Sequence, residues 1–269
     1  MGVLDSMLVV VPLHEYNEEV KGLLEKALKS VPSNYSIVIS TTNELNEKYN
    51  TELVNILGVG DRAQRTILCG DNTKSDFCTL VNNAVNTDYK WFSILEYDDE
   101  YTDIWFRNAE KFMEFKADAS VFLPLTELVD AENGRFVSYG NEAPWASSFS
   151  NEIGFIDYDC LGEFFDFYLT GSIFNTQDWV NCGGLKPSIK LTFWYEFLLR
   201  LTNSGKKAYV VPKLGYKHTV NRVGSLYDIY NQTIDSEEAE WWYKTAKEEC
   251  FYTQDRNKIY TENNNAEGE

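Results

Sequence analysis

Short apolar runs that alternate with helical patterns constrain this chain more than any other feature of its sequence. Residues 7–11 and 37–39 are continuous apolar runs, and between them apolar residues recur at helical spacing from position 20 to position 31. A strand that is buried on both faces of a sheet has this unbroken apolar character. Parallel strands need a crossover connection, which is usually a helix. The strand–helix–strand order therefore predicts an α/β fold with a mostly parallel central sheet flanked by helices.

Patterns of the same kind predict further elements along the chain. Between positions 125 and 168, turn residues and aromatic residues mixed with acids predict short strands and loops rather than helices. The other expected elements, in chain order, are a weak helix at 51–57, a strand at 66–69, helices near 80–85 and 105–113, strands at 120–123 and 169–174, a helix at 193–205, a strand at 208–212 and a terminal helix at 237–250.

The apolar run at 91–95 ends abruptly in a group of acids, Glu96, Asp98, Asp99 and Glu100. Acids at the exit of a buried strand would lie at the carboxyl edge of the sheet, where open α/β sheets bind ligands. Glu96 and Asp98 are two positions apart, so they point the same way on an extended chain. Two such carboxylates repel each other unless a cation lies between them, and hard oxygen ligands suit Mg²⁺ or Mn²⁺. The alternative interpretation is a polar turn that caps the next helix.

Composition excludes several classes of function. The formal net charge is −18, which argues against nucleic acid or an anionic membrane as a partner, because both need clustered Lys and Arg. The five cysteines include no C-x-x-C pair, so neither a zinc site nor a disulfide framework is indicated, and a reducing cytosol is expected. No apolar run approaches the ~20 residues of a transmembrane segment. The sequence leaves the oligomeric state open.

A series of motifs in a fixed order resembles the inverting family-2 glycosyltransferases over roughly residues 7–225. The motifs are VVVP…YNEE, SIVIS, LVNNAV, FSILEYDDE, GSIF…GGLKP, FWYEFLLRL and GKKAYVVP, followed by KH. The likeness is to compact single-domain members, including ones carried by phages and large viruses. It implies the GT-A type of α/β fold, with a smaller mixed sheet on the acceptor side.

The resemblance also implies a domain layout and an activity. One domain would span residues 1–230, with a nucleotide-sugar half at 1–100 and an acceptor half at 101–230. A helical extension at 231–260 and a disordered tail at 261–269 would follow. The implied reaction moves a sugar from a nucleotide-diphosphate sugar, with a UDP-sugar favoured, to the hydroxyl of a glycan or other acceptor, with inversion. The implied cofactor is Mn²⁺ or Mg²⁺, and the implied location is the cytoplasm, or the host cytoplasm if the protein is viral.

Two alternatives to a sugar transferase remain open. One is a non-catalytic homologue that binds a nucleotide sugar or a glycan. The other is a metal-dependent nucleotidyltransferase, which also binds a nucleotide on an α/β sheet. That class usually has a Gly- and Lys/Arg-rich phosphate loop near the first strand, and residues 14–19 contain no Gly, Lys or Arg. The missing loop disfavours the nucleotidyltransferase.

The resemblance assigns the metal and diphosphate residues. Glu96, Tyr97 and Asp98 fall on the family's Asp-x-Asp motif, which makes Asp98 and Asp99 the metal ligands and places Glu96 and Tyr97 against the nucleotide. His218 follows the last expected strand, where the family often has a third metal ligand, and an exposed loop histidine is the alternative. Arg222 would neutralise the diphosphate, because a guanidinium group matches phosphate oxygens.

The resemblance also assigns nucleotide contacts. Tyr16, or His14 in its place, would stack on the nucleobase. Ser40, Thr41 and Asn43 stand where the family usually has an Asp that contacts the base.

Four further residues are candidates from the resemblance. Asp76 and Asn82 would face the nucleotide, with a role on a helix surface as the alternative. Glu196 is the predicted general base, and Asp178 is the second candidate. The aromatic–acid stretch at 145–167 would form the acceptor wall, or else belong to the core.

Overall fold

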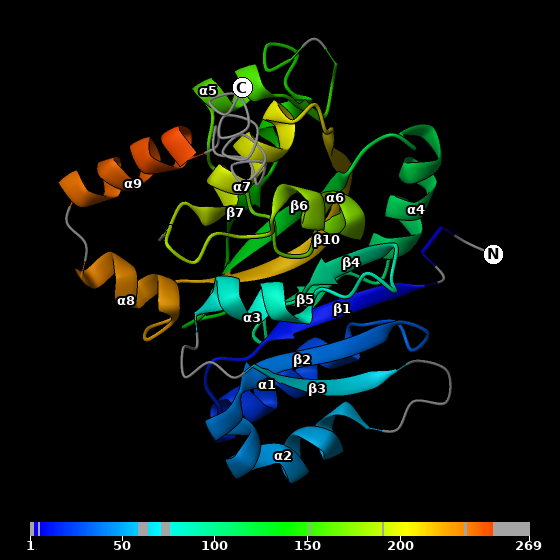
Figure 1. Cartoon of the computed structure of the whole chain (residues 1–269), viewed down its shortest axis with the longest axis vertical. Coiled ribbons are helices and arrows are strands. Elements are labelled where there is room, and N and C mark those ends of the chain that lie inside the picture. The colour runs from blue at the N-terminus through cyan, green and yellow to red at the C-terminus, as the bar shows by residue number, and fades with distance from the viewer. Residues whose placement is uncertain are drawn as a thin grey trace, which may run out of the picture.

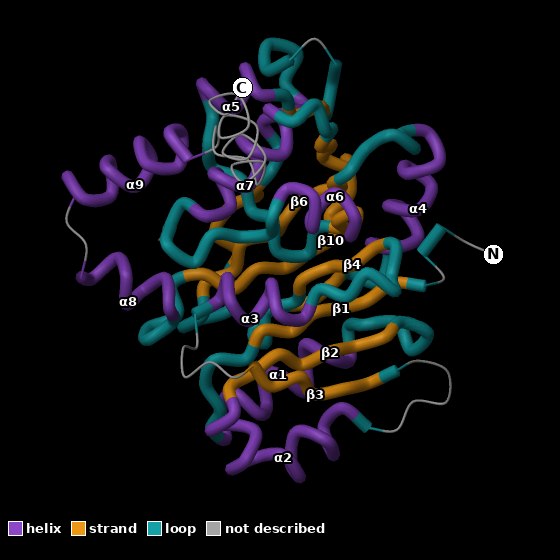
Figure 2. Tube along the Cα trace, viewed as in Figure 1, coloured by secondary structure: helices purple, strands orange, loops and turns teal. Residues whose placement is uncertain are grey.

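The computed structural model describes residues 3–4, 6–58, 64–70, 76–150, 152–189, 191–233 and 236–249. A single sheet crosses the molecule, and helices cover it on both faces (Figures 1 and 2). The predicted tail at 261–269 and the end of the predicted helical extension lie outside the described residues.

The first half of the chain forms the parallel part of the sheet. Its strands lie in the order β3-β2-β1-β4, and each pairs in parallel with its neighbour. Helices α1, α2 and α3 connect them, as the sequence predicts. The bounds are β1 (Met7–Pro12), α1 (Glu18–Lys29), β2 (Ser36–Thr42), α2 (Asn43–Leu57), β3 (Arg65–Gly70), α3 (Phe77–Ala84) and β4 (Trp91–Ile94).

The second half continues the same sheet with mixed strands. Strand β9 lies antiparallel between β4 and β6, and β10 lies between β6 and β5. The strands are β5 (Glu100–Tyr101), β6 (Val121–Asp130), β7 (Phe136–Gly140), β8 (Phe155–Ile156), β9 (Ile173–Asn175) and β10 (Ala208–Val220). The helices are α4 (Trp105–Phe115), the short 3₁₀ helix η1 (Ala143–Trp145), α5 (Tyr158–Glu163), α6 (Thr176–Cys182), α7 (Phe193–Asn203), α8 (Leu226–Thr233) and α9 (Ser236–Glu249).

Strand β1 shows why its sequence is continuously apolar. Val9 and Val11 belong to one core cluster, together with residues of α1 and α4. Leu8 and Val10 alternate with them and belong to the other cluster, together with residues of α3 and α7. Both faces of the strand are therefore buried, which confirms the prediction of a buried parallel strand.

Several elements differ from the sequence prediction: the strand expected at 169–174 covers only β9, and α6 and α8 were not expected. For three others the structure shows the reason. Helix α2 begins at Asn43 rather than near position 51, because the hydroxyl of Thr42 accepts a hydrogen bond from the backbone of Leu45 and caps the helix. Helix α5 lies in the stretch predicted to lack helices, and Asp157 caps it through the backbone of Cys160. Strand β10 continues well past position 212, since its outer part pairs with both β6 and β5.

The aromatic stretch at 145–167 lies largely in the core. Phe167 is buried in the second cluster, and Trp145, Phe149 and Phe164 pack against it. Trp145 also donates its indole N–H to the carbonyl of Val210, at 3.0 Å. The predicted acceptor wall is therefore not formed by this stretch as a whole.

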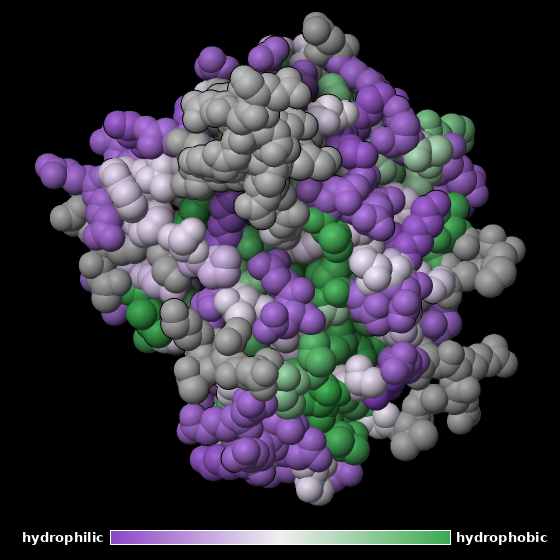
Figure 3. Space-filling view, in the orientation of Figure 1, coloured by the Kyte–Doolittle hydropathy of each residue, from purple (hydrophilic) through white to green (hydrophobic). Residues whose placement is uncertain are grey.

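The remaining features are the surface on the side of the sheet that carries α3 and the C-terminal helices α8 and α9. Figure 3 shows hydrophilic residues over α2 and hydrophobic residues in the middle of this face, over the strands near α3. Helices α8 and α9 lie along one side (Figure 1), and the hydroxyl of Thr192, next to α7, donates to the carbonyl of Trp242 on α9 at 3.1 Å. Within the part of the chain that is described, no helix has the length and apolar character needed to cross a bilayer.

Gly171 allows a close approach that the candidate site depends on. Its φ is +79°, and a Cβ at this position would collide with the ring of Tyr216 on β10. Its N–H donates to the carbonyl of Ile94 at the end of β4, at 2.8 Å. Gly171 therefore packs β10 directly against the end of β4.

We predict that Gly171→Ala destabilises the protein more than Gly134→Ala does. Both glycines have positive φ, at +79° and +67°, but a Cβ at Gly134 would meet nothing within 4 Å. Both variants therefore carry the backbone penalty of about 1–2 kcal/mol, and only Gly171→Ala adds an overpacking penalty of about 1–3 kcal/mol. Urea unfolding of both variants and the parent measures the difference. Equal losses would show that Tyr216 moves aside at no energetic cost.

Candidate functional site

The candidate site lies where two neighbouring parallel strands end. The N–H of Leu95 donates to the carbonyl of Val10 at 2.9 Å, so the loop after β4 starts beside the loop after β1. The next strand after β1 in the chain lies on its other side, which makes this pair the point where the strand order reverses. Open α/β sheets bind ligands at such a switch point, outside the carboxyl ends of the strands.

The outer end of β10 closes the site from the other side. Asp99 accepts a hydrogen bond from the backbone N–H of Thr219 on one oxygen, and its other oxygen lies 2.7 Å from Nδ1 of His218. The hydroxyl of Thr219 donates to the carbonyl of Asp98 at 2.6 Å. Because β10 also pairs with β5, these contacts bring the predicted residues Asp98, Asp99 and His218 together. His218 lies within the long strand, not in a loop after it.

Three of these side chains could hold a metal ion. One ligand atom each from Glu96, Asp99 and His218 lie within 4.8 Å of one another. Asp99 is almost fully buried, with 1% of its surface exposed, while Glu96 and His218 are partly exposed. Asp98 lies outside this group of three, and its carboxylate contacts Arg222 instead. The structure thus groups Glu96, which was predicted to contact the nucleotide, with Asp99 and His218, and it leaves Asp98, a predicted metal ligand, outside this group.

Burial and mutual repulsion change the protonation of this cluster. Burial raises the pKa of Glu96 to about 8, and the charges of Asp99 and Asp98 add to the rise, while His218 opposes it. Burial and Asp99 likewise raise the pKa of Asp98 to about 6, against the opposing charge of Arg222. Burial alone would lower the pKa of His218, but its contact with Asp99 and the nearby carboxylates outweigh burial and raise it to about 9. Glu96 therefore holds a proton at neutral pH, and binding of a divalent cation by a carboxylate requires that the proton leave.

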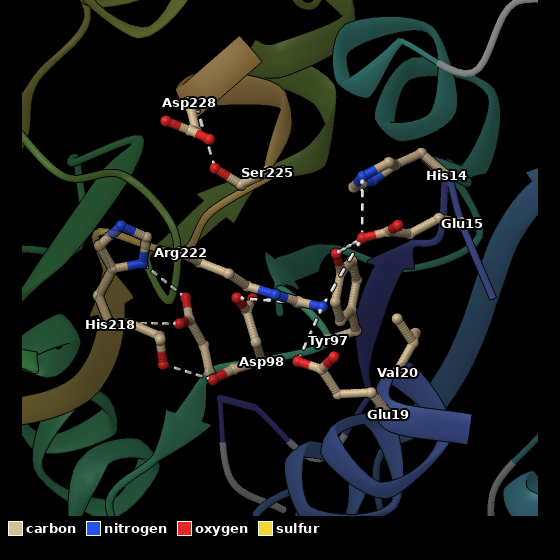
Figure 4. A network of polar contacts seen from close by, with 12 residues as sticks. His14, Glu15, Glu19, Val20, Tyr97, Asp98, His218, Arg222, Ser225 and Asp228 are labelled. Atoms are coloured by element: carbon tan, nitrogen blue, oxygen red, sulfur yellow. Dashed lines mark hydrogen bonds and ion pairs between the residues drawn. The ribbon is translucent and has the colours of Figure 1, made fainter. Parts of the chain in front are cut away.

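Arg222 contacts acids from the loop after β1, the start of α1 and the loop after β4 (Figure 4). Its guanidinium group lies 3.3 Å from Asp98, 3.7 Å from Glu15 and 3.8 Å from Glu19. It also lies over the ring of Tyr97, with its central carbon 4.9 Å from the ring centroid. The predicted diphosphate residue therefore stands between the loop after β4 and the start of α1.

Glu15 and Thr219 belong to the site, although the sequence analysis did not single them out. Glu15 accepts a hydrogen bond from the hydroxyl of Tyr97 at 2.5 Å, and His14 lies 5.6 Å from the same ring. Burial lowers the pKa of His14. The sequence could have indicated Glu15 by its position, because it follows β1 and so lies at the same sheet edge as the acids after β4. Thr219 donates one hydrogen bond from its backbone and one from its hydroxyl, and its place beside the acids depends on the pairing of β10, which no residue pattern reveals.

Several predicted nucleotide contacts lie elsewhere in the structure. Tyr16 is buried in the core, where its ring packs on Tyr49 at 4.7 Å and its hydroxyl donates to Glu52. Thr41 is fully buried and donates its hydroxyl to the carbonyl of Leu13. Asn43 is an exposed residue at the start of α2. Of the residues predicted to contact the base or stack on it, His14 is the one whose side chain reaches Tyr97.

Asp76 and Asn82 have the structural roles that were their alternatives. Asp76 caps α3 through the backbone N–H of Thr79, at 2.9 Å. The side chain of Asn82 both donates to the carbonyl of Leu185 and accepts from its N–H, at 2.7 and 2.9 Å. It therefore holds the segment after Gly184 against α3.

Neither candidate base presents a free carboxylate. Glu196 is fully buried, and both of its oxygens accept hydrogen bonds from Arg200, at 2.8 and 2.7 Å. Lys186 lies 3.0 Å from one of the same oxygens. Asp178 accepts a hydrogen bond from Ser120 and pairs with Lys206 at 2.6 Å. These contacts are those of structural ion pairs, contrary to the expectation of a base that faces an acceptor.

Comparisons with known proteins show the fold. No protein-family model matches the chain, and no curated protein matches it either. The chain is similar to S. aureus TarS residues 1–349 in complex with UDP, with a TM-score of 0.52 and 18% identity over 84% of this chain and 62% of that one. The same fragment in complex with UDP-GlcNAc gives a TM-score of 0.50 and 15% identity over 81% and 59% of the two chains.

These similarities confirm the GT-A type of fold, with a mostly parallel central sheet flanked by helices. The chain spans 62% of the length of the first structure, so it is shorter than the chains it resembles. The structures come from a bacterium and do not support the narrower resemblance to phage and viral members.

We predict that the metal-free protein loses stability as pH rises from about 5 to about 9. The pKa of Glu96 is about 8 in the fold against a usual 4.5, so the folded state binds more protons than the unfolded chain between those values, and rising pH favours unfolding. The pKa of His218 is raised from 6.5 to about 9, so this group lowers stability in the same direction at higher pH. Urea unfolding in EDTA across this range measures the slope.

Glu96→Gln should flatten this pH dependence below about pH 8, because the amide cannot ionise. Glu163→Gln is the matched control, since Glu163 is an exposed carboxyl on α5. If both variants keep the slope of the parent, Glu96 is not the group that titrates.

We predict that Glu196→Gln destabilises the protein by about 3–5 kcal/mol, because it leaves the buried charge of Arg200 without its partner. Glu47→Gln, on an exposed face of α2, should change stability by no more than about 0.5 kcal/mol. Thermal and urea unfolding measure both variants. A Glu196→Gln protein that is as stable as the parent but inactive in sugar transfer would restore Glu196 as the base.

Proposed function

We propose that the protein is a metal-dependent glycosyltransferase that moves a sugar from a nucleoside-diphosphate sugar, with a UDP-sugar favoured, to an acceptor hydroxyl with inversion. The observation that carries the proposal is the cluster of Glu96, Asp99 and His218 at the switch point of a GT-A sheet. The likeness in fold to S. aureus TarS, solved with UDP and with UDP-GlcNAc, supports the class of donor.

The donor set of the cluster fits Mn²⁺ or Mg²⁺. Carboxylate oxygens suit both ions, and an imidazole nitrogen favours Mn²⁺. Glu96, Asp99 and His218 would hold the ion. The pKa of Glu96 is raised first by burial and then by the charges of Asp99 and Asp98, so a cation at this place would favour its ionised form. Such an ion stabilises the negative charge that develops on the leaving diphosphate.

The remaining residues of the site would bind and orient the donor. Arg222 would exchange its contacts with Glu15 and Glu19 for the diphosphate, because a phosphate group offers the guanidinium paired oxygens. Tyr97 is held by the hydrogen bond from its hydroxyl to Glu15 and keeps Arg222 over its ring. His14, beside Tyr97, is the aromatic residue at this edge that could contact the base.

One observation favours a second candidate, a non-catalytic protein that binds a nucleotide sugar. Inverting transfer needs a base that takes the proton of the acceptor hydroxyl as the oxygen attacks the anomeric carbon. Glu196 and Asp178 are both occupied by cationic partners. Incubation with a UDP-sugar and Mn²⁺ separates the two candidates, since a transferase releases UDP by transfer or slow donor hydrolysis and a binding protein does not.

We predict that UDP binding depends on a divalent cation and on the cluster. Calorimetric titration with UDP should show binding with Mn²⁺ and a loss of at least about tenfold in affinity with EDTA, because the diphosphate would then face unneutralised carboxylates. His218→Ala and Asp98→Asn should each weaken binding in Mn²⁺. Asp103→Asn, an exposed carboxylate outside the cluster, should not. Equal UDP affinity with Mn²⁺ and with EDTA would contradict the metal assignment.

A further inference from the structure

Three tyrosines and one aspartate gather beside the candidate cation site, from distant parts of the chain. Tyr168 and Asp166 lie in the segment between α5 and β9, Tyr227 lies on α8, and Tyr243 lies on α9. These four residues are called the tyrosine cluster. None of them was named as a site residue in the sequence, although Asp166 lies within the stretch at 145–167 that was considered as an acceptor wall, and Tyr243 lies within the expected helical extension at 231–260.

The tyrosine cluster adjoins the cation site through Tyr168. The ring of Tyr168 lies 5.5 Å from the imidazole of His218, at an angle of 55°. Burial, followed by the charge of Asp166 and the phenol of Tyr227, raises the pKa of Tyr168 to about 12. Burial and the same two neighbours raise the pKa of Tyr243. Asp166 and Tyr227 are thus common neighbours of Tyr168 and Tyr243, and the ring of Phe165, next to Asp166 in the chain, packs on the ring of Tyr243 at 4.5 Å.

The members of the cluster are held in place by packing and hydrogen bonds outside it. The side chain of Asn141 donates to the carbonyl of Tyr168 and accepts from its N–H, at 2.8 and 2.9 Å. The ring of Tyr243 packs on Phe165 at 4.5 Å and on Tyr195 at 5.9 Å. Such support gives a binding group a fixed position before a ligand arrives, which lowers the entropy lost on binding.

The polar groups of the cluster are open to a ligand. Within the described ranges, the carboxylate of Asp166 and the three phenol hydroxyls have no hydrogen-bond or ion-pair partner. More deeply placed tyrosines behave differently, since Tyr97 and Tyr209 donate their hydroxyls to Glu15 and Glu152. Tyr227 is 65% exposed. A carboxylate and phenols without partners beside flat rings form a surface that is both polar and aromatic.

We propose that the tyrosine cluster is the acceptor subsite and that the acceptor is a carbohydrate with a pyranose ring. The proposal rests on the proposed function and names the substrate class of that same site. The flat face of a pyranose packs on aromatic rings, and its hydroxyls exchange hydrogen bonds with a carboxylate and with phenols. The contact between Tyr168 and His218 puts a sugar bound here next to the donor side of the site.

The test measures carbohydrate binding separately from transfer. The full chain is applied to an array of immobilised glycans, with and without UDP and Mn²⁺, and the bound glycans are then titrated in solution. The parent should bind at least one pyranose-containing glycan. Asp166→Asn and Tyr227→Ala should each weaken that affinity about tenfold or more, because each removes a charged hydrogen bond or a stacking ring. Phe115→Ala, an exposed aromatic residue on α4, is the control and should bind as the parent does.

The outcomes separate this inference from the proposed function. UDP binding in Mn²⁺ should be unchanged in Asp166→Asn and Tyr227→Ala, which shows that both variants are folded. A parent that binds UDP with Mn²⁺ but no glycan, or variants that bind glycans as tightly as the parent, would overturn the subsite and leave the donor site intact. A parent that binds glycans through these residues but binds no UDP would retain the subsite and refute the glycosyltransferase.

Discussion

The contact between Asp99 and the outer end of β10 holds the candidate site together. Asp99 and His218 are 119 positions apart, and Asp99 accepts from the backbone of Thr219 while it pairs with His218. Strand β10 reaches this place only because it continues beside β6 and β5 to Val220. Close packing at Gly171 supports the same approach, and the hydroxyl of Tyr216 accepts from the N–H of Glu96 at 3.1 Å. The geometry of the cluster is thus a property of the strand pairing rather than of a flexible loop.

The sequence was sufficient where local pattern and tertiary environment agree. Strands β1 and β4 are buried on both faces, so their continuous apolar runs identified them, and the acids after β4 marked the ligand edge of the sheet. The same reasoning could not find the full length of β10, whose last four residues are only partly buried and depend on pairing with β5 and β6. Thr42 was a visible capping signal for α2, and it was missed because the following residues are polar.

The side chains were harder to predict than the elements, for a physical reason. Tyr16 lies in the loop where a nucleobase could bind, but whether its ring faces the ligand or the core depends on packing against Tyr49 of α2. Glu196 and Arg200 are four positions apart on a helix, a spacing that itself indicates an ion pair. The spacing therefore favours an ion pair, whereas the resemblance to the family predicted a general base at Glu196. The element that carries each residue could be predicted from the sequence, whereas the partners of its side chain required the three-dimensional structure.

The electrostatics of the site support the proposed dependence of diphosphate binding on a cation. Arg222 forms ion pairs with Glu15, Glu19 and Asp98, and His218 forms one with Asp99. The cationic groups of the site are therefore already paired with carboxylates. An entering diphosphate would draw Arg222 away and leave those carboxylates facing new negative charge. Repulsion between like charges a few ångströms apart costs several kcal/mol where water is excluded, about 4 kcal/mol at 4 Å for an effective dielectric constant near 20. A divalent ion held by Glu96, Asp99 and His218 would offset this repulsion, which adds to burial in raising the pKa of Glu96. The same acids that make the metal-free site unfavourable are therefore the groups that would make nucleotide binding conditional on a metal.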